Sequence, residues 1–258
     1  MSVDSSRWVT ALRRSQDRLA TSVTGLDGAG LRAPSYASEW SIAQVLSHLG
    51  SQAEIFGLLL GAGLSGGDAP GQDAFPPIWE AWNTRSPEEQ ATDSIAANEN
   101  FVARLEALDP AQRDAFRLAA FGMDLDFPMF LRLRLAENAV HCWDITVALD
   151  PSATVIPEAV ELLVDGLPDL VARVGKPTAA SLVIQVSTTD PQRRYALVTD
   201  GVQLEPWSER DVAGVLELSA EELLRFVYGR LDAAHAETAR LDAGALTLDD
   251  LRAIFPGF

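Results

Sequence analysis

The spacing of apolar residues changes near residue 150, and this change limits the folds that the chain can adopt. Before that point, four stretches carry apolar residues at helical spacing, at 4–24, 42–60, 86–108 and 126–150. Beyond it, a helical stretch near 157–174 precedes short β-rich runs separated by turn residues, at 181–188, 193–198, 202–206 and 211–219. Helical patterns return at 219–231 and 247–255. Long helices followed by mixed strands and helices indicate the α+β class, with an antiparallel four-helix bundle first.

The same change predicts two domains. We place the boundary near Pro151–Pro157, with a helical domain at 1–152 and a smaller α+β domain at 153–258. Segment 61–77 holds five glycines and three prolines and is expected to be a loop, either a flexible surface loop or a lid over a site. Trp79 and Trp82 follow this segment, and packing is the favoured role for both, with a pocket wall as the alternative.

Composition excludes several classes of protein. The chain has 37 acidic and 20 basic residues among 258, a formal net charge of −17, which argues against binding nucleic acid or an anionic membrane surface. Hydrophobic residues make up 47%, too many for a disordered chain. No apolar run approaches the roughly 20 residues that a membrane-spanning helix needs. The first residues lack the apolar core of a signal peptide, so we expect a cytoplasmic protein.

Candidate metal ligands stand out on the fourth helical stretch. Glu137 and His141 are four residues apart, and Asp144 follows three residues later, so the three side chains share one helix face. A carboxylate and an imidazole on an inward face need partners, and a divalent metal is an economical one. His48, on the second helical stretch, would supply a third ligand. Two histidines, one carboxylate and an open position are typical of a catalytic site for zinc or a similar ion.

Each of these residues also has a plainer interpretation. A glutamate and a histidine four residues apart usually form an exposed pair, and His48 could be an ordinary core histidine. Asp144 is more often a surface or helix-end charge. His235 lies among alanine and acidic residues and is expected at the surface. Cys142, the single cysteine, points away from the proposed ligands on a helix and is expected in the core rather than as a nucleophile.

Two motifs resemble the DinB-like family of mycothiol-dependent enzymes, the mycothiol-dependent maleylpyruvate isomerase family. Trp40 is followed by VLSHL, which matches the family's Trp-to-His-Leu segment and places His48 as a metal ligand. Every spacing of the family's Arg-x-x-Glu-x-x-x-His-x-x-Asp segment is kept here, in Arg134, Glu137, His141 and Asp144. The resemblance implies an N-terminal four-helix bundle that binds a divalent metal through His48, Glu137 and His141.

The second half is also similar to the family's C-terminal α+β domain, which resembles sterol-carrier folds. The segments ELSAEELLRFVYGRL and IFPGF carry this likeness. Arg230 would match an arginine that the family places towards the cleft between domains, where it could fork a carboxylate, although a helix-end cation is equally consistent with its position. Arg134 is a candidate for binding the thiol cofactor or orienting Glu137, with a structural salt bridge as the alternative.

The function that the resemblance implies is a metal-dependent, mycothiol-dependent enzyme. Zinc is the expected metal, and mycothiol would serve as thiol cofactor or cosubstrate. A metal-bound thiolate would attack a small electrophilic substrate, as in an isomerase or an S-transferase. Two alternatives stay open, a carrier of an apolar small ligand and a non-catalytic metal-binding stress-response protein. The sequence specifies neither the substrate nor the oligomeric state.

Overall fold

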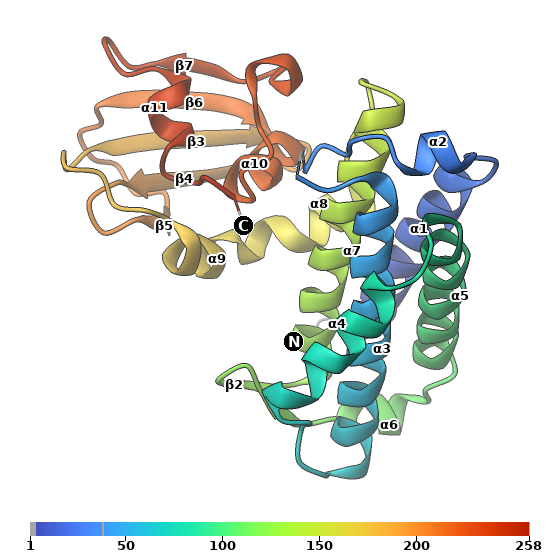
Figure 1. Cartoon of the computed structure of the whole chain (residues 1–258). Coiled ribbons are helices and arrows are strands. Elements are labelled where there is room, and N and C mark those ends of the chain that lie inside the picture. Colours follow the sequence, from blue (N-terminus) through green and yellow to red (C-terminus); the bar gives the residue numbers. More distant parts are fainter. Residues whose placement is uncertain (1–3, 38, 258) are drawn as a thin grey trace. The chain divides into compact units, whose positions relative to one another are not determined.

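A computed structural model describes residues 4–37 and 39–257 (Figure 1). The chain divides into two compact units, one that ends at Ala159 and one that begins at Val160. This division lies a few residues beyond the boundary proposed from the sequence, within the helix that begins at Pro157. The first unit is mainly helical and the second is built on a sheet, so the expected α+β class is confirmed.

Four long helices span the described part of the first unit, and the sequence predicted all four. They are α1 (Ser5–Val23), α3 (Ile42–Ser65), α5 (Pro87–Glu106) and α7 (Phe127–Leu149). The helix α1 packs against α5 and α7, and α3 packs against the same two helices. A polar residue accepts a backbone N–H at the start of each one, namely Asp4, Ser41, Ser86 and Asp126.

Shorter elements connect these helices. They are α2 (Gly28–Leu31), the 3₁₀ helix η1 (Gln72–Ala74), α4 (Phe75–Asn83), α6 (Pro110–Ala115), and the antiparallel hairpin of β1 (Leu118–Ala120) and β2 (Met123–Leu125). Among the described residues, no helix is both long enough and apolar enough to cross a bilayer.

The expectation of a loop over 61–77 is wrong at both of its ends. The helix α3 continues to Ser65, and Gly63 within it lies directly against the ring of Phe116, where a larger side chain would overlap it. The helix α4 begins at Phe75, since the two following prolines occupy its first turn, where a missing N–H costs no helical hydrogen bond. Only a short connection between α3 and η1 lacks helical structure.

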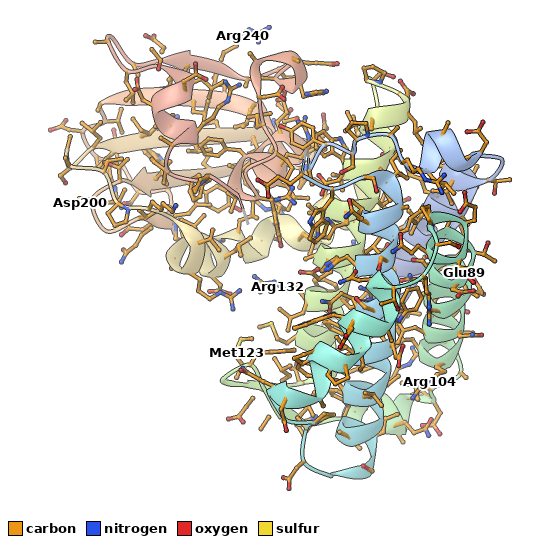
Figure 2. All side chains as sticks on the ribbon, in the orientation of Figure 1. Glu89, Arg104, Met123, Arg132, Asp200 and Arg240 are labelled. Carbon is orange, nitrogen blue, oxygen red and sulfur yellow. The ribbon has the colours of Figure 1, made fainter. Side chains whose placement is uncertain are left out.

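The core of the first unit lies between α1, α3 and α7. Leu19, Ile42, Leu46, Leu49 and Ile145 are fully buried there. Figure 2 shows the side chains of the neighbouring helices filling the interior of this unit. This core holds α3 and α7 together beside His48, which lies next to Leu49 in sequence, and beside His141, which lies one turn before Ile145.

The second unit contains a five-stranded sheet in its described residues, in the order β5-β4-β3-β6-β7. The strands are β3 (Val183–Thr189), β4 (Arg193–Val198), β5 (Gln203–Pro206), β6 (Gly214–Ser219) and β7 (Arg240–Asp242). The first three form the antiparallel meander that the sequence predicted, β6 is parallel to β3, and β7 is antiparallel to β6. The remaining elements are α8 (Pro157–Leu163), η2 (Val164–Gly166), α9 (Leu167–Val174), α10 (Ala220–Val227), η3 (Ala233–His235) and α11 (Leu248–Arg252).

Candidate metal centre

Two helices bring the three predicted ligands together. His48 comes from α3, and Glu137 and His141 lie one turn apart on α7. One donor atom from each residue lies within 4.8 Å of the other two. The Nε2 atom of His48 is 3.1 Å from Oε2 of Glu137, and the Nε2 atom of His141 is 3.8 Å from the same oxygen. Two imidazole nitrogens and a carboxylate oxygen therefore converge on one small volume.

Asp144 holds His141 in a defined orientation. Its carboxylate is fully buried and lies 2.9 Å from Nδ1 of His141. An ionised carboxylate can only accept a hydrogen bond, so Nδ1 is the nitrogen that carries the proton in the neutral imidazole, and the lone pair of that form is on Nε2. The lone pair then belongs to the nitrogen that faces Glu137, as in metal sites where a carboxylate orients the ligating histidine. The plainer expectation of a surface or helix-end charge is wrong for Asp144, because its side chain has no exposed surface.

The electrostatics of the cluster favour the protonation states that bind metal. Burial alone would raise the pKa of Glu137, but the hydrogen bond with His48 and the nearby positive charge lower the pKa to about 2. Burial lowers the pKa of His48, more than its hydrogen bond with Glu137 raises it. The carboxylate is therefore ionised and the His48 imidazole neutral near neutral pH, which are the forms that coordinate a cation.

A cavity of about 530 Å³ opens beside His48. Trp40 lines it and lies over both histidines, with its ring centroid 5.3 Å from that of His48 and 6.3 Å from that of His141. Trp79, on α4, lines it as well. The sequence favoured packing for Trp79 because tryptophans near a Pro-Pro turn usually pack, and the pocket wall that it kept as the alternative is where Trp79 lies. Trp82 does pack, since it is buried against Gly50 of α3 and donates to Glu54 over 2.9 Å.

Arg134 lies in the core of the first unit. Its side chain has no exposed surface, and its guanidinium donates to the carbonyl of Leu49 over 3.3 Å and to the side chain of Asn98. The central carbon of the guanidinium lies 5.6 Å from the ring centre of Phe56 and 5.8 Å from that of Phe101. Burial lowers the pKa of Arg134 to about 10, although the charge of Glu137 acts in the opposite sense. A part in cofactor binding stays a prediction for this residue.

Arg230 belongs to the second unit. It follows Gly229, whose φ of 72° lies in the left-handed region and where a Cβ would overlap Gly257. Its side chain is 6% exposed, and Nη1 donates to the carbonyl of Tyr228 over 2.7 Å. Its assignment as a catalytic residue stays a prediction.

The contacts of the two remaining candidates, Cys142 and His235, indicate structural roles. Cys142 is buried, and burial raises the pKa of its thiol to about 12, so it belongs to the core as expected. The Nδ1 atom of His235 lies 2.8 Å from the carboxylate of Asp232, at the short helix η3. Neither residue belongs to the metal-ligand cluster found among the described residues.

Comparisons of the sequence and of the fold with known proteins give the same result. Residues 12–146, just over half of the chain, match the family model described as the mycothiol maleylpyruvate isomerase N-terminal domain. The crystal structure of the mycothiol-dependent maleylpyruvate isomerase is similar at a TM-score of 0.71, with 13% identity over 95% of each chain. A histidine-to-alanine mutant of that isomerase gives the same TM-score at 12% identity, again over 95% of each chain. No curated protein matches the sequence.

Proposed function

The chain belongs to the mycothiol maleylpyruvate isomerase N-terminal domain family, and on that basis we propose that it is an enzyme that depends on a divalent metal and on mycothiol. Zinc is the preferred metal, and the substrate is a small electrophile on which the protein acts as an isomerase or an S-transferase. The convergence of His48, Glu137 and His141 is the observation that carries this proposal.

The proposal extends to the architecture. The four long helices correspond to the family's DinB-like four-helix bundle, with the sterol-carrier-like domain after it, and the domain limits remain 1–152 and 153–258. The contacts that α1 and α3 make with α5 and α7 are those of such a bundle, and the mixed sheet after it supports the second assignment.

The donor set fits a divalent cation. Two imidazoles and one carboxylate are a set of protein ligands found in catalytic zinc sites, which leave a further position for water or substrate. The cavity beside His48 provides room for that position. A divalent cation held by these donors would favour the deprotonated form of a coordinating thiol at neutral pH.

The protein's own residues would prepare the site for this chemistry. Asp144 holds the protonated Nδ1 of His141 and so directs Nε2 towards the donors. Trp40 covers the two imidazole rings and restricts the access of water to them. Arg134 lies one helical turn before Glu137 and adds a buried positive charge that favours the ionised carboxylate, which is its contribution to the cofactor site.

Arg230 is the proposed catalytic residue in the second unit. Its guanidinium can donate two parallel hydrogen bonds, so it suits a substrate that carries a carboxylate. Replacement by lysine keeps the charge but removes this geometry, and a carboxylate-binding role predicts a higher KM for an anionic substrate in Arg230→Lys.

Metal analysis of the full chain tests the proposal first. We expect about one zinc per chain in the wild type and in His235→Ala, which removes a histidine outside the cluster. His48→Ala, Glu137→Ala and His141→Ala should each lose most of it. Wild-type protein that neither contains zinc nor takes it up would overturn the proposal.

A second assay separates the two reaction types. The zinc-loaded protein is incubated with mycothiol and maleylpyruvate, and the products are identified by mass spectrometry. An isomerase converts the substrate and returns mycothiol unchanged, whereas an S-transferase consumes mycothiol and forms a thioether. The absence of mycothiol-dependent turnover over a broad panel of electrophiles would contradict the enzymatic role.

A further inference from the structure

A second cavity, of about 400 Å³, lies along α3 at a distance from the proposed metal ligands. Its wall comes from α3, from the connection after that helix, from the start of α4 and from the β1–β2 hairpin, namely Leu59, residues 69–72, Phe75 and residues 119–124. Leu59 follows His48 by about three turns of the same helix, roughly 16 Å at 1.5 Å per residue. The volume lies within the range of small-molecule sites, and the described residues that line this cavity are not those that line the cavity beside His48.

The tip of the β1–β2 hairpin holds an aromatic residue in an unfavourable position. Ala120 pairs with Met123, so Phe121 and Gly122 form a two-residue turn, and their φ angles of 55° and 73° both lie in the left-handed region. Such turns favour asparagine, aspartate or glycine at the first position, because a bulky side chain is crowded at positive φ. Phe121 is also 48% exposed. The fold gains little from a phenylalanine here, and residues held in strained positions concentrate at ligand sites.

The wall of this second cavity is apolar and aromatic, with a single charged group. Phe75 and Phe121 contribute rings, and Met123, labelled in Figure 2, contributes a thioether. Gln72 adds a carboxamide, and Asp124 adds a carboxylate. No lysine, arginine or histidine is among the described residues that line it. The face of a phenyl ring carries negative potential and attracts cations, so both the rings and the carboxylate favour a positive charge.

This combination selects an apolar ligand that carries a positive charge. An anion would meet the carboxylate of Asp124 and the ring faces without any cation to bind it, in a chain whose net charge is −17. A neutral apolar ligand would make the apolar contacts but would gain nothing from the carboxylate. An organic cation with an aromatic ring makes both kinds of contact at once.

We propose that this second cavity binds small arylalkylammonium ligands, at a site separate from the metal centre. Phe75 and Phe121 pack against the ring of the ligand, and Asp124 attracts its charged nitrogen. The contact with the ligand offsets the strain that Phe121 carries in the free protein. None of these residues belongs to the metal-ligand cluster, so the inference stands or falls independently of the proposed enzyme activity.

Calorimetric titration of the zinc-loaded full chain with benzyltrimethylammonium tests the charge preference. The quaternary nitrogen has no lone pair, so this probe cannot become a ligand of zinc. Benzyl alcohol and phenylmethanesulfonate carry the same ring with no charge and with a negative charge. We expect the cation to bind roughly threefold or more tightly than the alcohol, and the sulfonate to bind most weakly. Equal or tighter binding of the alcohol or the sulfonate would overturn the inference, as would no measurable binding of the cation.

Three further variants locate the bound cation. Asp124→Asn should remove most of the preference for benzyltrimethylammonium over benzyl alcohol. Asp114→Asn, which neutralises an exposed acid of α6 outside the cavity, should keep that preference. Gln52→Ala changes the cavity beside His48 and should bind the cation like the wild type. Weaker binding in Gln52→Ala with wild-type binding in Asp124→Asn would place the cation beside His48 and overturn the inference.

Phe121→Asn separates a binding role of the ring from a structural one. The substitution creates the Asn-Gly pair that such turns prefer, so it relieves the strain and removes the ring together. We expect a higher melting temperature and an affinity for benzyltrimethylammonium that is lower by roughly fivefold or more. Because the variant is expected to be at least as stable as the wild type, unfolding would not account for the lost affinity. A lower melting temperature, or wild-type affinity for the cation, would overturn the role assigned to Phe121 and the inference with it.

Discussion

A buried carboxylate determines which nitrogen of His141 faces the other donors. Asp144 has no exposed surface, and its contact with Nδ1 of His141 leaves Nε2 beside Glu137. Without that contact, the imidazole would be free to rotate or to carry its proton on Nε2, where a lone pair is needed. The strength of metal binding should therefore depend on a residue that is not itself a ligand.

Asp144→Asn should weaken zinc binding without changing its stoichiometry. The amide keeps the shape of the side chain but removes the charge, and losses of this kind cost about 10-fold to 100-fold in metal affinity. Competition with a chromophoric chelator measures the effect. Asp150→Asn, at the exposed end of the same helix, is the control. Wild-type affinity in Asp144→Asn would show that packing alone orients the imidazole.

At the scale of single residues, sequence patterns predicted the three metal ligands but not the environment of the residues around them. Helical spacing places Glu137 and His141 on one face, the metal-site interpretation proposed His48 as the third ligand, and the family motif supported all three. The family motif proposed Arg134 for the cofactor or for orienting Glu137, and no sequence pattern showed that its guanidinium is enclosed by the core. For Trp79 the sequence favoured packing over a pocket wall, and its place in the cavity depends on how α4 lies against α3, which no local pattern specifies.

The helix α4 lies close to α3 because α3 has a glycine at the contact. A Cβ at Gly50 would overlap the ring of Trp82, which is buried and also bonded to Glu54. Since α4 supplies Trp79 and Asn83 to the cavity beside His48, this close approach brings those two side chains to its wall.

Gly50→Ala should therefore destabilise the protein, by about 1–3 kcal/mol as for other overpacked sites. Gly61→Ala is the matched control on the same helix, since a Cβ there would meet no neighbouring atom within 4 Å. Removal of a glycine from a helix interior should make Gly61→Ala neutral or more stable by up to about 1 kcal/mol. Urea unfolding measures both, and equal changes in the two variants would contradict the contact with Trp82.

In the second unit, a buried glutamate links the start of α10 to a distant segment. Burial would raise the pKa of Glu222, but hydrogen bonds from Thr238 and from the backbone at Ser219 outweigh it and lower the pKa below its ordinary value of 4.5. A lowered pKa means that the ionised form stabilises the folded state. Its contribution is complete above the unfolded value and is lost as pH falls through the folded value.

Glu222→Gln should lower the melting temperature at neutral pH and flatten its fall below about pH 5. Loss of hydrogen bonds to a charged group is worth about 1.5–3 kcal/mol. Thermal melting between about pH 3 and 7 measures this difference. Glu217→Gln, exposed on β6, should follow the wild-type curve. Parallel curves for Glu222→Gln and the wild type would mean that Glu222 does not stabilise the fold through its charge.

Elements with strong signals were predicted, and the three-residue strands were not. The four long helices have apolar periodicity and polar N-caps, and β3, β4 and β5 follow one another with turn residues between them. The strands β1, β2 and β7 have three residues each, too few to show a period. They exist because a partner strand satisfies their backbone groups, and that is a property of the fold.

Over the whole molecule, the metal donors and the tryptophans are unevenly distributed. The three proposed ligands and the cavity belong to the unit that ends at Ala159. Of the six tryptophans, five lie in the same unit, namely Trp8, Trp40, Trp79, Trp82 and Trp143. In Trp207→Phe, tryptophan fluorescence therefore reports on that unit alone.

Zinc should raise the melting temperature of Trp207→Phe when melting is followed by this fluorescence. A ligand that binds only the folded state at 1,000 times its Kd adds about 4 kcal/mol to the free energy of unfolding. The ligands are contributed by α3 and α7, so the metal would join two helices that separate on unfolding. Chelation should reverse the shift, and the double variant Trp207→Phe/Glu137→Ala should show none. An equal shift in that double variant would mean that zinc stabilises the unit through other groups, and the assignment of Glu137 as a ligand would then be wrong.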